Sequence, residues 1–271
     1  SQTSPIQVYP LAVAHKLVKV PSPLFRAEYN FLLIFSHGGG SQQIDSEVLS
    51  LQKNDLLFIR EGHLNSIQSI DPTTQGYFIY MDNGILPLVF TDRLLLNRLT
   101  FYPKHSLSSD RIDWLCRCCE LLVQQEDGYS YTLEIQTSLL KAITSKLAEA
   151  SPAILSRPDR QSEITMLFKE AVYQHFASNR DISFYADTLA VSENYLTRCV
   201  KMVTNRSPKQ HINEVVIAYS KMFLRDVSKD ISEIAFELNF SDVSYFGRLF
   251  KKLTDMTPTE YRNSIIQDLS E

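Results

Sequence analysis

The 271-residue sequence lacks the long apolar run that a membrane helix needs, because nowhere do about eighteen apolar residues follow one another. Its first ten residues also lack the basic start and apolar core of a signal peptide. We therefore expect a cytoplasmic protein with no membrane partner. With 44% hydrophobic and 21% charged residues, the chain can bury a core in each of two domains.

Cysteine is scarce and badly placed for a structural site. Three of the four cysteines, at positions 116, 118 and 119, crowd into about one helical turn. The Cys-x-x-Cys that they form has no second such motif and no histidine pair to complete a metal site. We expect no structural zinc, no disulfide framework and no cofactor, and reduced thiols fit a cytoplasmic protein.

A surplus of positive charge is also missing. The net charge is −4 and the isoelectric point is near 5.9. Residues 161–271 contain 13 Lys and Arg against 15 Asp and Glu, which gives −2. Because the neutralisation of phosphates supplies much of the affinity for nucleic acids, a nucleic-acid binder of this composition must gather its basic residues on particular surfaces.

The hydrophobic pattern divides the chain into two parts. Up to about residue 101, short apolar stretches alternate with turn residues, which is typical of an antiparallel sandwich or barrel. From about 108 to 150, apolar residues recur at helical spacing. Residues 151–160 carry two prolines among polar residues and predict a linker, after which the pattern is helical throughout. We predict an α+β protein with a first domain at 1–150 and an all-α domain at 161–271.

The second domain repeats itself at an offset of 49 to 50 residues. The matched pairs are Asp181/Asp230, Ala186/Ala235, Leu189/Leu238 and Ser192/Ser241 at 49 and, beyond an extra residue near Ser244, Tyr195/Tyr245, Arg198/Arg248, Lys201/Lys251, Thr204/Thr254 and Pro208/Pro258 at 50. Each copy predicts a short helix, a turn and a second helix capped by Ser192 or Ser241. Ser207 and Thr257, each followed by Pro and then by Gln or Glu, predict a capping box that starts a further helix. The repeat therefore predicts two helix-turn-helix units, at about 183–204 and 232–254.

The second helix of each unit is predicted to have one apolar and one cationic face. The polar face carries Asn194, Thr197, Arg198 and Lys201 in the first copy, and Ser244, Arg248, Lys251 and Lys252 in the second. A lone basic face is usually only solvated, but two copies that keep cations at matching positions favour two major-groove helices. Arginine can donate two hydrogen bonds to guanine, asparagine can read adenine, and lysine can contact phosphate. Because Val243 and Gly247 offer few hydrogen bonds, we expect the first unit to discriminate bases more sharply.

At these residues the chain resembles the AraC/XylS family of bacterial transcription regulators. The double helix-turn-helix at about 161–268 carries the resemblance, and residues 244–252 and 257–262 are similar to the family's signature. In this family the two recognition helices enter successive major grooves, joined by a long helix that here would cover residues 207–225. The resemblance implies an operator in double-stranded DNA, contact with RNA polymerase and, for most members, activation.

The chain departs from the family pattern at four positions. Asn205, Asn239 and Asp255 stand where the family usually has Gly, and Val216 stands where it usually has Arg. Asn and Asp tolerate a left-handed backbone better than other non-Gly residues, so we expect the turns to survive. The loss of the Arg puts one contact of the linking helix in doubt.

The first domain resembles the family's effector module, a cupin-like β-barrel followed by helices that pair two subunits. Residues 51–63 carry this resemblance, which implies an unknown small-molecule effector and a homodimer. Candidate ligand contacts are Phe35, Arg60, His63 and Tyr80, although ordinary barrel and loop residues would look the same. The leucines of the helices at about 108–150 could either form a dimer seam or cover the barrel.

Other functions remain open for the first domain. Enzymatic cupins hold a metal with closely spaced histidines, whereas the histidines at 15, 37, 63 and 105 are scattered, so we expect neither a metal nor an enzyme. One alternative is a cupin that binds or converts a small molecule and uses its helical domain for interaction. Another is a regulator whose first domain only dimerises or binds a protein.

Overall fold

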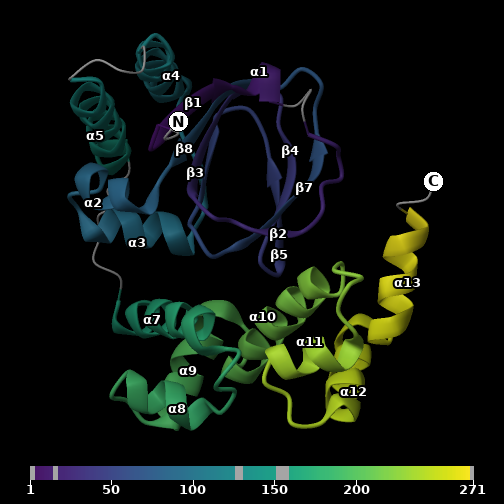
Figure 1. Ribbon diagram of the computed structural model, residues 1–271. Coiled ribbons are helices and arrows are strands. Elements are labelled where there is room, and N and C mark those ends of the chain that lie inside the picture. The colour runs from purple at the N-terminus through teal and green to yellow at the C-terminus, as the bar shows by residue number, and fades with distance from the viewer. Residues whose placement is uncertain (1–3, 15–17, 126–130, 151–158, 269–271) are drawn as a thin grey trace. The chain divides into compact units, whose positions relative to one another are not determined.

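The computed structural model describes residues 4–14, 18–125, 131–150 and 159–268 (Figure 1). The chain divides into two compact units, Ser1–Arg157 and Pro158–Glu271. The predicted linker at 151–160 lies outside the described residues except for its last two positions. In the described part of the chain, no helix is both long and apolar enough to cross a membrane. The α+β fold class is confirmed, because antiparallel sheets form the first unit and helices form the second.

Two antiparallel sheets form in the described part of the first unit. The five-stranded sheet has the order β1 (Ile6–Pro10), β8 (Gln75–Met81), β3 (Asn30–His37), β6 (Asp55–Ile59) and β9 (Lys104–Ser106). The four-stranded sheet has the order β2 (Phe25–Arg26), β7 (Leu64–Ile70), β4 (Gly40–Ile44) and β5 (Glu47–Leu51), and the short helix α1 (Leu11–Ala14) follows β1. Strands of both sheets enclose a cavity, as in a cupin-like barrel.

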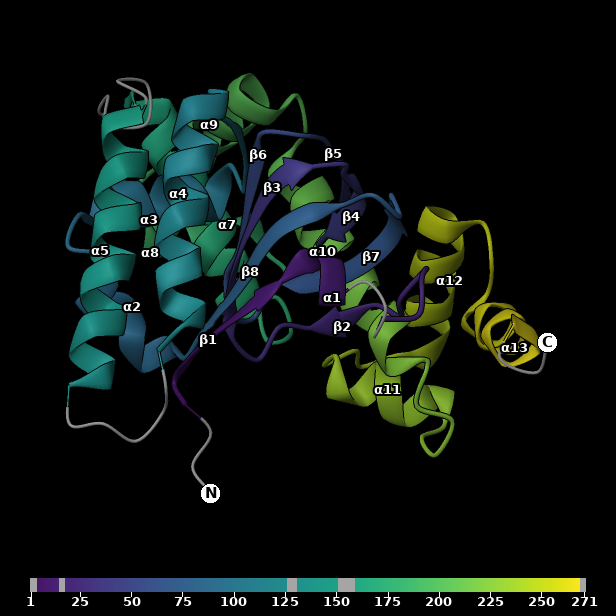
Figure 2. The ribbon, with the colours of Figure 1, turned by 90° about the horizontal axis from the view of Figure 1, so that it is seen from above.

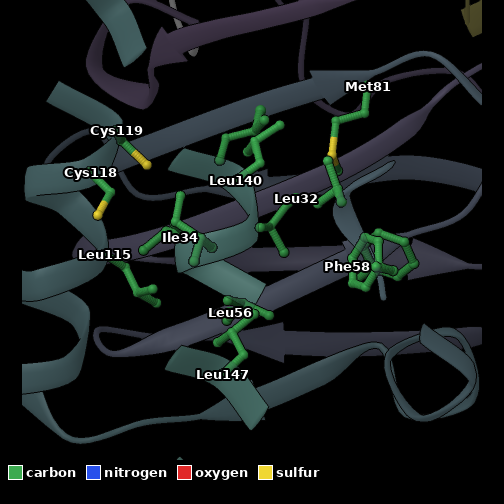
Figure 3. Packing of buried hydrophobic residues seen from close by; sticks show 14 of the residues in the cluster. Leu32, Ile34, Leu56, Phe58, Met81, Leu115, Cys118, Cys119, Leu140 and Leu147 are labelled. Atoms are coloured by element: carbon green, nitrogen blue, oxygen red, sulfur yellow. The ribbon is translucent and has the colours of Figure 1, made fainter. Parts of the chain in front are cut away.

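Strand β3 separates two hydrophobic clusters because its side chains alternate between the faces of the five-stranded sheet. Leu33 and Phe35 belong to the cluster inside the barrel. Leu32 and Ile34 belong to the other cluster, where they pack with residues of the helices outside the sheet (Figure 3). All four side chains are at least nine-tenths buried. The unbroken apolar run in the sequence thus reflects burial on both faces.

Among the described residues of the first unit, four α-helices contribute to the outer cluster. They are α2 (Leu86–Val89), α3 (Arg93–Phe101), α4 (Ser109–Val123) and α5 (Thr132–Ala150). Figures 1 and 2 show α4 and α5 side by side, with α4 next to β3 and β1. Leu115 and Leu122 of α4 and Leu140 and Leu147 of α5 are buried in this cluster. Of the two roles considered for these leucines, they cover the barrel sheet, whereas Leu133 is 43% exposed.

The strand pattern expected up to residue 101 is wrong for residues 83–101. This segment forms a short 3₁₀ helix, η1 (Asn83–Ile85), followed by α2 and α3. Asp82 and Asp92 explain the difference, because each side chain accepts a hydrogen bond from the backbone N–H two residues later and so caps a helix start. Both aspartates also fit turns between strands, and that ambiguity concealed the helices.

Seven helices form the described part of the second unit. They are α7 (Arg160–His175), α8 (Ile182–Thr188), α9 (Glu193–Thr204), α10 (Pro208–Phe223), α11 (Ile231–Glu237), α12 (Val243–Thr254) and α13 (Pro258–Asp268). The order α8–α9–α10 recurs as α11–α12–α13, as the sequence repeat predicts. Both predicted capping boxes are confirmed, since Ser207 and Gln210 bond reciprocally at the start of α10, and Thr257 and Glu260 do so at α13.

The turns of the second unit use a left-handed backbone where glycine is absent. The φ angles of Asn205, Asn239 and Asp255 are 56°, 57° and 62°. Asn205 and Asp255 end α9 and α12, and Asn239 lies in the turn after α11. The expectation that these turns survive without glycine is therefore confirmed.

Candidate nucleic-acid interface

Helix α9 presents the first predicted set of polar residues. Its N-cap is Ser192, whose hydroxyl accepts a hydrogen bond of 3.2 Å from the Tyr195 N–H, as predicted. The apolar face, formed by Leu196, Cys199 and Val200, is fully buried and fixes the rotation of the helix. On the other face Asn194, Arg198 and Lys201 are exposed, and Thr197 is half-buried.

Helix α12 presents the second set in the same way. Phe246 and Phe250 are fully buried, while Ser244, Arg248, Lys251 and Lys252 are exposed. Arg248 lies 3.6 Å from the Asp242 carboxylate, and both side chains are largely exposed. A surface ion pair of this kind contributes little, so phosphate or a base can replace the carboxylate as the partner of Arg248.

The N-cap expected for α12 was wrong by one residue. Asp242, not Ser241, caps the helix, and its carboxylate accepts a hydrogen bond of 2.8 Å from the Ser244 N–H. Asp242 is offset from Ser192 by 50 residues, so the extra residue of the second copy lies before the cap rather than near Ser244. The exposed set on α12 is unaffected, because its matches already used the offset of 50.

A contact between the two repeats was not expected from the sequence. The Arg180 side chain, which precedes α8, lies over the Phe240 ring between α11 and α12 and donates a hydrogen bond to the Leu238 carbonyl oxygen. The Lys209 ammonium donates a 3.0 Å hydrogen bond to the Arg180 carbonyl oxygen. Burial lowers the pKa of the Arg180 guanidinium, and the aromatic face compensates part of that cost. Arg180 thus joins the first helix-turn-helix to the second.

Val216 lies in the interior of the second unit. Its side chain is fully buried on α10. A buried valine at this position packs against neighbouring side chains and cannot reach a nucleic acid. The contact that the departure from the family pattern put in doubt is therefore not made by residue 216.

One of the four predicted ligand residues lines the cavity in the first unit. The cavity has a volume of about 230 Å³, and Phe35 lines it. Arg60, His63 and Tyr80 are not among its described lining residues. The Nδ1 atom of His63 lies 2.7 Å from the Asp45 carboxylate, and the Tyr80 ring lies 4.2 Å from the Tyr29 ring, centroid to centroid.

The sequence did not reveal the two polar lining residues that are buried. Gln42 of β4 and Asn65 of β7 are buried, and the Gln42 amide donates a 2.5 Å hydrogen bond to the Asn65 carbonyl oxygen. The alternation of side chains along the strands could have identified them, because Gln42 in β4 and Asn65 in β7 are polar residues at positions that face the barrel interior. Among the described residues, no three His, Cys, Asp or Glu side chains gather closely enough to hold a metal ion.

Comparison with known proteins decides how the helical repeat is to be interpreted. A family model described as a helix-turn-helix domain matches residues 185–264. The chain is 27% identical to the transcriptional activator RhaR of Mannheimia succiniciproducens over 95% of this chain and 93% of RhaR. It is 19% identical to the activator RhaS of Citrobacter koseri, over 93% and 92% of the two chains. Residues 185–264 are thus an AraC-type helix-turn-helix domain, and the chain is similar to these two activators over more than nine-tenths of its length. It is a DNA-binding transcription regulator, and these relatives are regulators rather than enzymes.

Solved structures of AraC/XylS regulators are also similar to this chain. An apo form of ToxT from Vibrio cholerae matches with a TM-score of 0.48 and 14% identity, over 95% of this chain and 96% of ToxT. The C-terminal domain of AraT from Geobacillus stearothermophilus matches with a TM-score of 0.37 and 26% identity, over 39% of this chain and 88% of that domain.

Proposed function

We propose that this AraC-type regulator activates transcription from a specific operator that α9 and α12 read together, and that a small effector bound in the first unit modulates this activity. The observation that carries the proposal is the pair of equivalent helices, each buried on its apolar side and cationic on its exposed side. The DNA contacts proposed are Asn194, Thr197, Arg198, Lys201, Ser244, Arg248, Lys251 and Lys252.

The two helices carry different chemistry on their exposed faces. Arg198 and Asn194 on α9 can each form two hydrogen bonds to a base edge. On α12, Arg248 is the corresponding base reader, and Lys251 and Lys252 suit phosphates. Gly247 has no side chain to offer to DNA, although its position on α12 is open, since a Cβ atom added there would meet nothing within 4 Å. These differences support sharper base discrimination by the first unit.

Selection of bound sequences from random duplex DNA tests the proposal. We expect the wild-type chain to enrich a motif of two half-elements roughly 10 base pairs apart. The Arg198→Ala/Arg248→Ala variant should lose about a hundredfold or more in affinity for that motif. The matched control is Arg160→Ala/Lys229→Ala, which also removes two positive charges but from surface ion pairs outside α9 and α12.

Two outcomes would contradict this function. Equal losses in the two double variants would show that charge alone, rather than the faces of α9 and α12, determines binding. If folded protein enriched no sequence at low salt, the proposal of a specific operator would be contradicted, because low salt favours every phosphate contact.

The proposal also includes a homodimer. The exposed side chains of Leu121 and Val123 on α4 and of Leu133 and Ile135 on α5 support a homodimer, since their neighbours are already buried against the barrel sheet. A dimer doubles the specific contacts on one operator. Sedimentation of Leu121→Glu/Ile135→Glu should show monomers where the wild type forms dimers.

The proposal further includes contact with RNA polymerase, because an activator acts through that enzyme. It also includes a location in the bacterial cytoplasm, where both the polymerase and the operator lie.

The cavity supports the effector role of the first unit. An effector can change DNA binding only if it binds two states of the regulator unequally. Phe35 is the proposed ligand contact within the cavity, whereas Arg60, His63 and Tyr80 could act only outside its described lining. A first unit that solely dimerises or binds a protein would show no small-molecule binding at all.

A further inference from the structure

The cavity of the first unit lies between the two sheets of the barrel. Strands β3, β6 and β8 line it from the five-stranded sheet, and β2, β4, β5 and β7 line it from the other. Most of its wall is therefore strand, and Leu11 of α1 together with Val18, Val20, Ser22 and Gly39 outside the strands completes it. Such walls preform the site, and a preformed site reports the chemistry of its ligand through the side chains that line it.

The walls are mainly aliphatic and aromatic. Four phenylalanines line the cavity, namely Phe25, Phe31, Phe35 and Phe78, and the rings of Phe31 and Phe78 stack at 5.2 Å between centroids. Leu33 of β3 and Ile59 of β6 add branched aliphatic surface. None of the described lining residues is charged. An ionised ligand would enter this space without a counter-charge from them, which is costly in an apolar site.

The polar side chains of the cavity are few and already hydrogen-bonded, and among them the Ser22 hydroxyl accepts a 2.8 Å hydrogen bond from the Ile67 N–H. Ser41 and Ser69 share a hydrogen bond of 2.7 Å between their hydroxyls, and Gln42 donates to Asn65. A sugar presents many hydroxyls that would need partners, and these two pairs cannot supply them. Within the described residues the Gln42–Asn65 pair has no further side-chain partner, so it retains one carbonyl oxygen and free N–H groups for a single polar group of a ligand.

The geometry points to an uncharged, mainly apolar effector with a ring and at most one hydroxyl or carbonyl group, held between the phenylalanines with its polar group on the Gln42–Asn65 pair. This inference rests on the proposed effector role of the first unit and specifies the ligand class. An apolar protein cavity of about 150 Å³ holds benzene, so 230 Å³ suits about eight to ten non-hydrogen atoms.

A matched set of small probes tests the ligand class on the full chain. Benzyl alcohol and toluene are neutral, benzoate and benzylammonium have similar size but opposite charges, and glucose is a polyol. We expect titrations followed by NMR to show saturable binding of the two neutral aromatics, with at least tenfold weaker binding of the other three. Benzoate, benzylammonium or glucose binding as tightly as benzyl alcohol would overturn the inference.

Variants of the lining residues locate the binding. Ile67→Trp should fill the cavity and abolish benzyl alcohol binding, whereas Val48→Trp, on the exposed side of β5, should not. Ser69→Phe provides a second filled variant at an exposed edge position, in case Ile67→Trp does not fold. Gln42→Leu should weaken benzyl alcohol about three- to tenfold relative to toluene, which is the range expected for removal of one neutral hydrogen bond. Unchanged binding in both filled variants would overturn the assignment to this cavity.

Operator binding by the same samples separates this inference from the proposed function. Benzyl alcohol binding that leaves DNA affinity unchanged would support the ligand class and contradict the effector role for this compound. An absence of binding by either neutral aromatic, in a chain that still binds its operator, would overturn the ligand class and leave the DNA-binding regulator in place.

Discussion

Ala190 and Asn239 occupy equivalent turns of the two helix-turn-helix units and have nearly the same backbone, with φ angles of 52° and 57°. The two residues are 49 positions apart, as the repeat requires. Asn tolerates this left-handed region, but Ala has no side-chain compensation for it. The first turn is therefore strained where the second is not.

Replacement of Ala190 by Gly should relieve this strain. We expect Ala190→Gly to raise the free energy of unfolding by about 1 kcal/mol, because the left-handed conformation costs a non-Gly residue roughly 1–2 kcal/mol and the flexibility of Gly offsets part of the gain. Urea denaturation of the wild type and the variant measures the difference. Asn239→Ala is the reciprocal change and should destabilise the chain. A loss of stability in Ala190→Gly would show that the turn is unstrained.

Arg180 should determine how the two recognition helices act together. Arg180→Ala removes the contact with Phe240 and Leu238 that joins the repeats. We expect about tenfold weaker binding to an operator with both half-elements, since the removal of an aromatic contact and a charge-assisted hydrogen bond frees their relative orientation. Binding to each half-element alone should change little. Fluorescence anisotropy measures the affinities for three duplexes, one with the complete operator and one with each half-element.

The conservative variant distinguishes orientation from charge. Arg180→Lys keeps the positive charge but loses the planar group that covers the Phe240 ring. It should therefore resemble Arg180→Ala on the complete operator. Wild-type binding by Arg180→Lys would indicate that Arg180 contributes only its charge.

The two recognition helices should differ in base discrimination. Asn194→Ala/Arg198→Ala should flatten the preference at the first half-element by roughly 1–3 kcal/mol for each base pair that these side chains read. Ser244→Ala/Arg248→Ala should change the second half-element less, with a larger share of its effect common to all sequences. Parallel selections on the two variants measure both preferences, and an equal flattening of the two half-elements would contradict the assignment.

His211 should make the stability of the second unit sensitive to acid. Burial, followed by the nearby charges of Lys169 and Arg206, lowers the pKa of His211 to about 4, and its Nε2 atom lies 2.9 Å from the Thr204 hydroxyl. The unfolded chain binds this proton near pH 6.5, so protonation favours unfolding. The contribution of the neutral imidazole is present above about pH 6.5 and is lost as the pH falls towards 4.

A variant without this imidazole isolates its effect from the titration of the carboxylates. His211→Gln retains a hydrogen-bonding side chain and does not titrate in this range. The free energy of unfolding should fall less between pH 6.5 and 4 in His211→Gln than in the wild type. Equal slopes for the two proteins would show that His211 titrates alike in the folded and unfolded chains.

Local signals made the second unit predictable from its sequence. The capping boxes at Ser207 and Thr257 and the left-handed ends at Asn205 and Asp255 each depend on a few adjacent residues, so the sequence contains all that they need. The cap of α12 was misplaced because Ser241 and Asp242 are both good N-cap residues. A pattern cannot choose between two adjacent candidates.

Non-local contacts limited what the sequence could reveal. Gln42 and Asn65 meet across two strands, and Arg180 reaches Phe240 over 60 positions of the chain, so neither pairing follows from spacing. The leucines of α4 and α5 have helical periodicity whether they face a sheet or another subunit. Only the fold shows that most of them cover the barrel.

Because side chains alternate along β3, this single strand separates the cavity of the barrel from the hydrophobic cluster under the outer helices. Leu33 borders the cavity, and the adjacent Leu32 packs among the residues of the outer helices. A molecule that pushed this strand outward by a fraction of an ångström would press directly on α4, because close-packed interiors yield little. Ligand binding in the barrel would then affect the helices without a hinge or a chain of intervening side chains. Substitutions along residues 31–35 should therefore alternate in effect, with one changing ligand binding and the next changing the response of the helices.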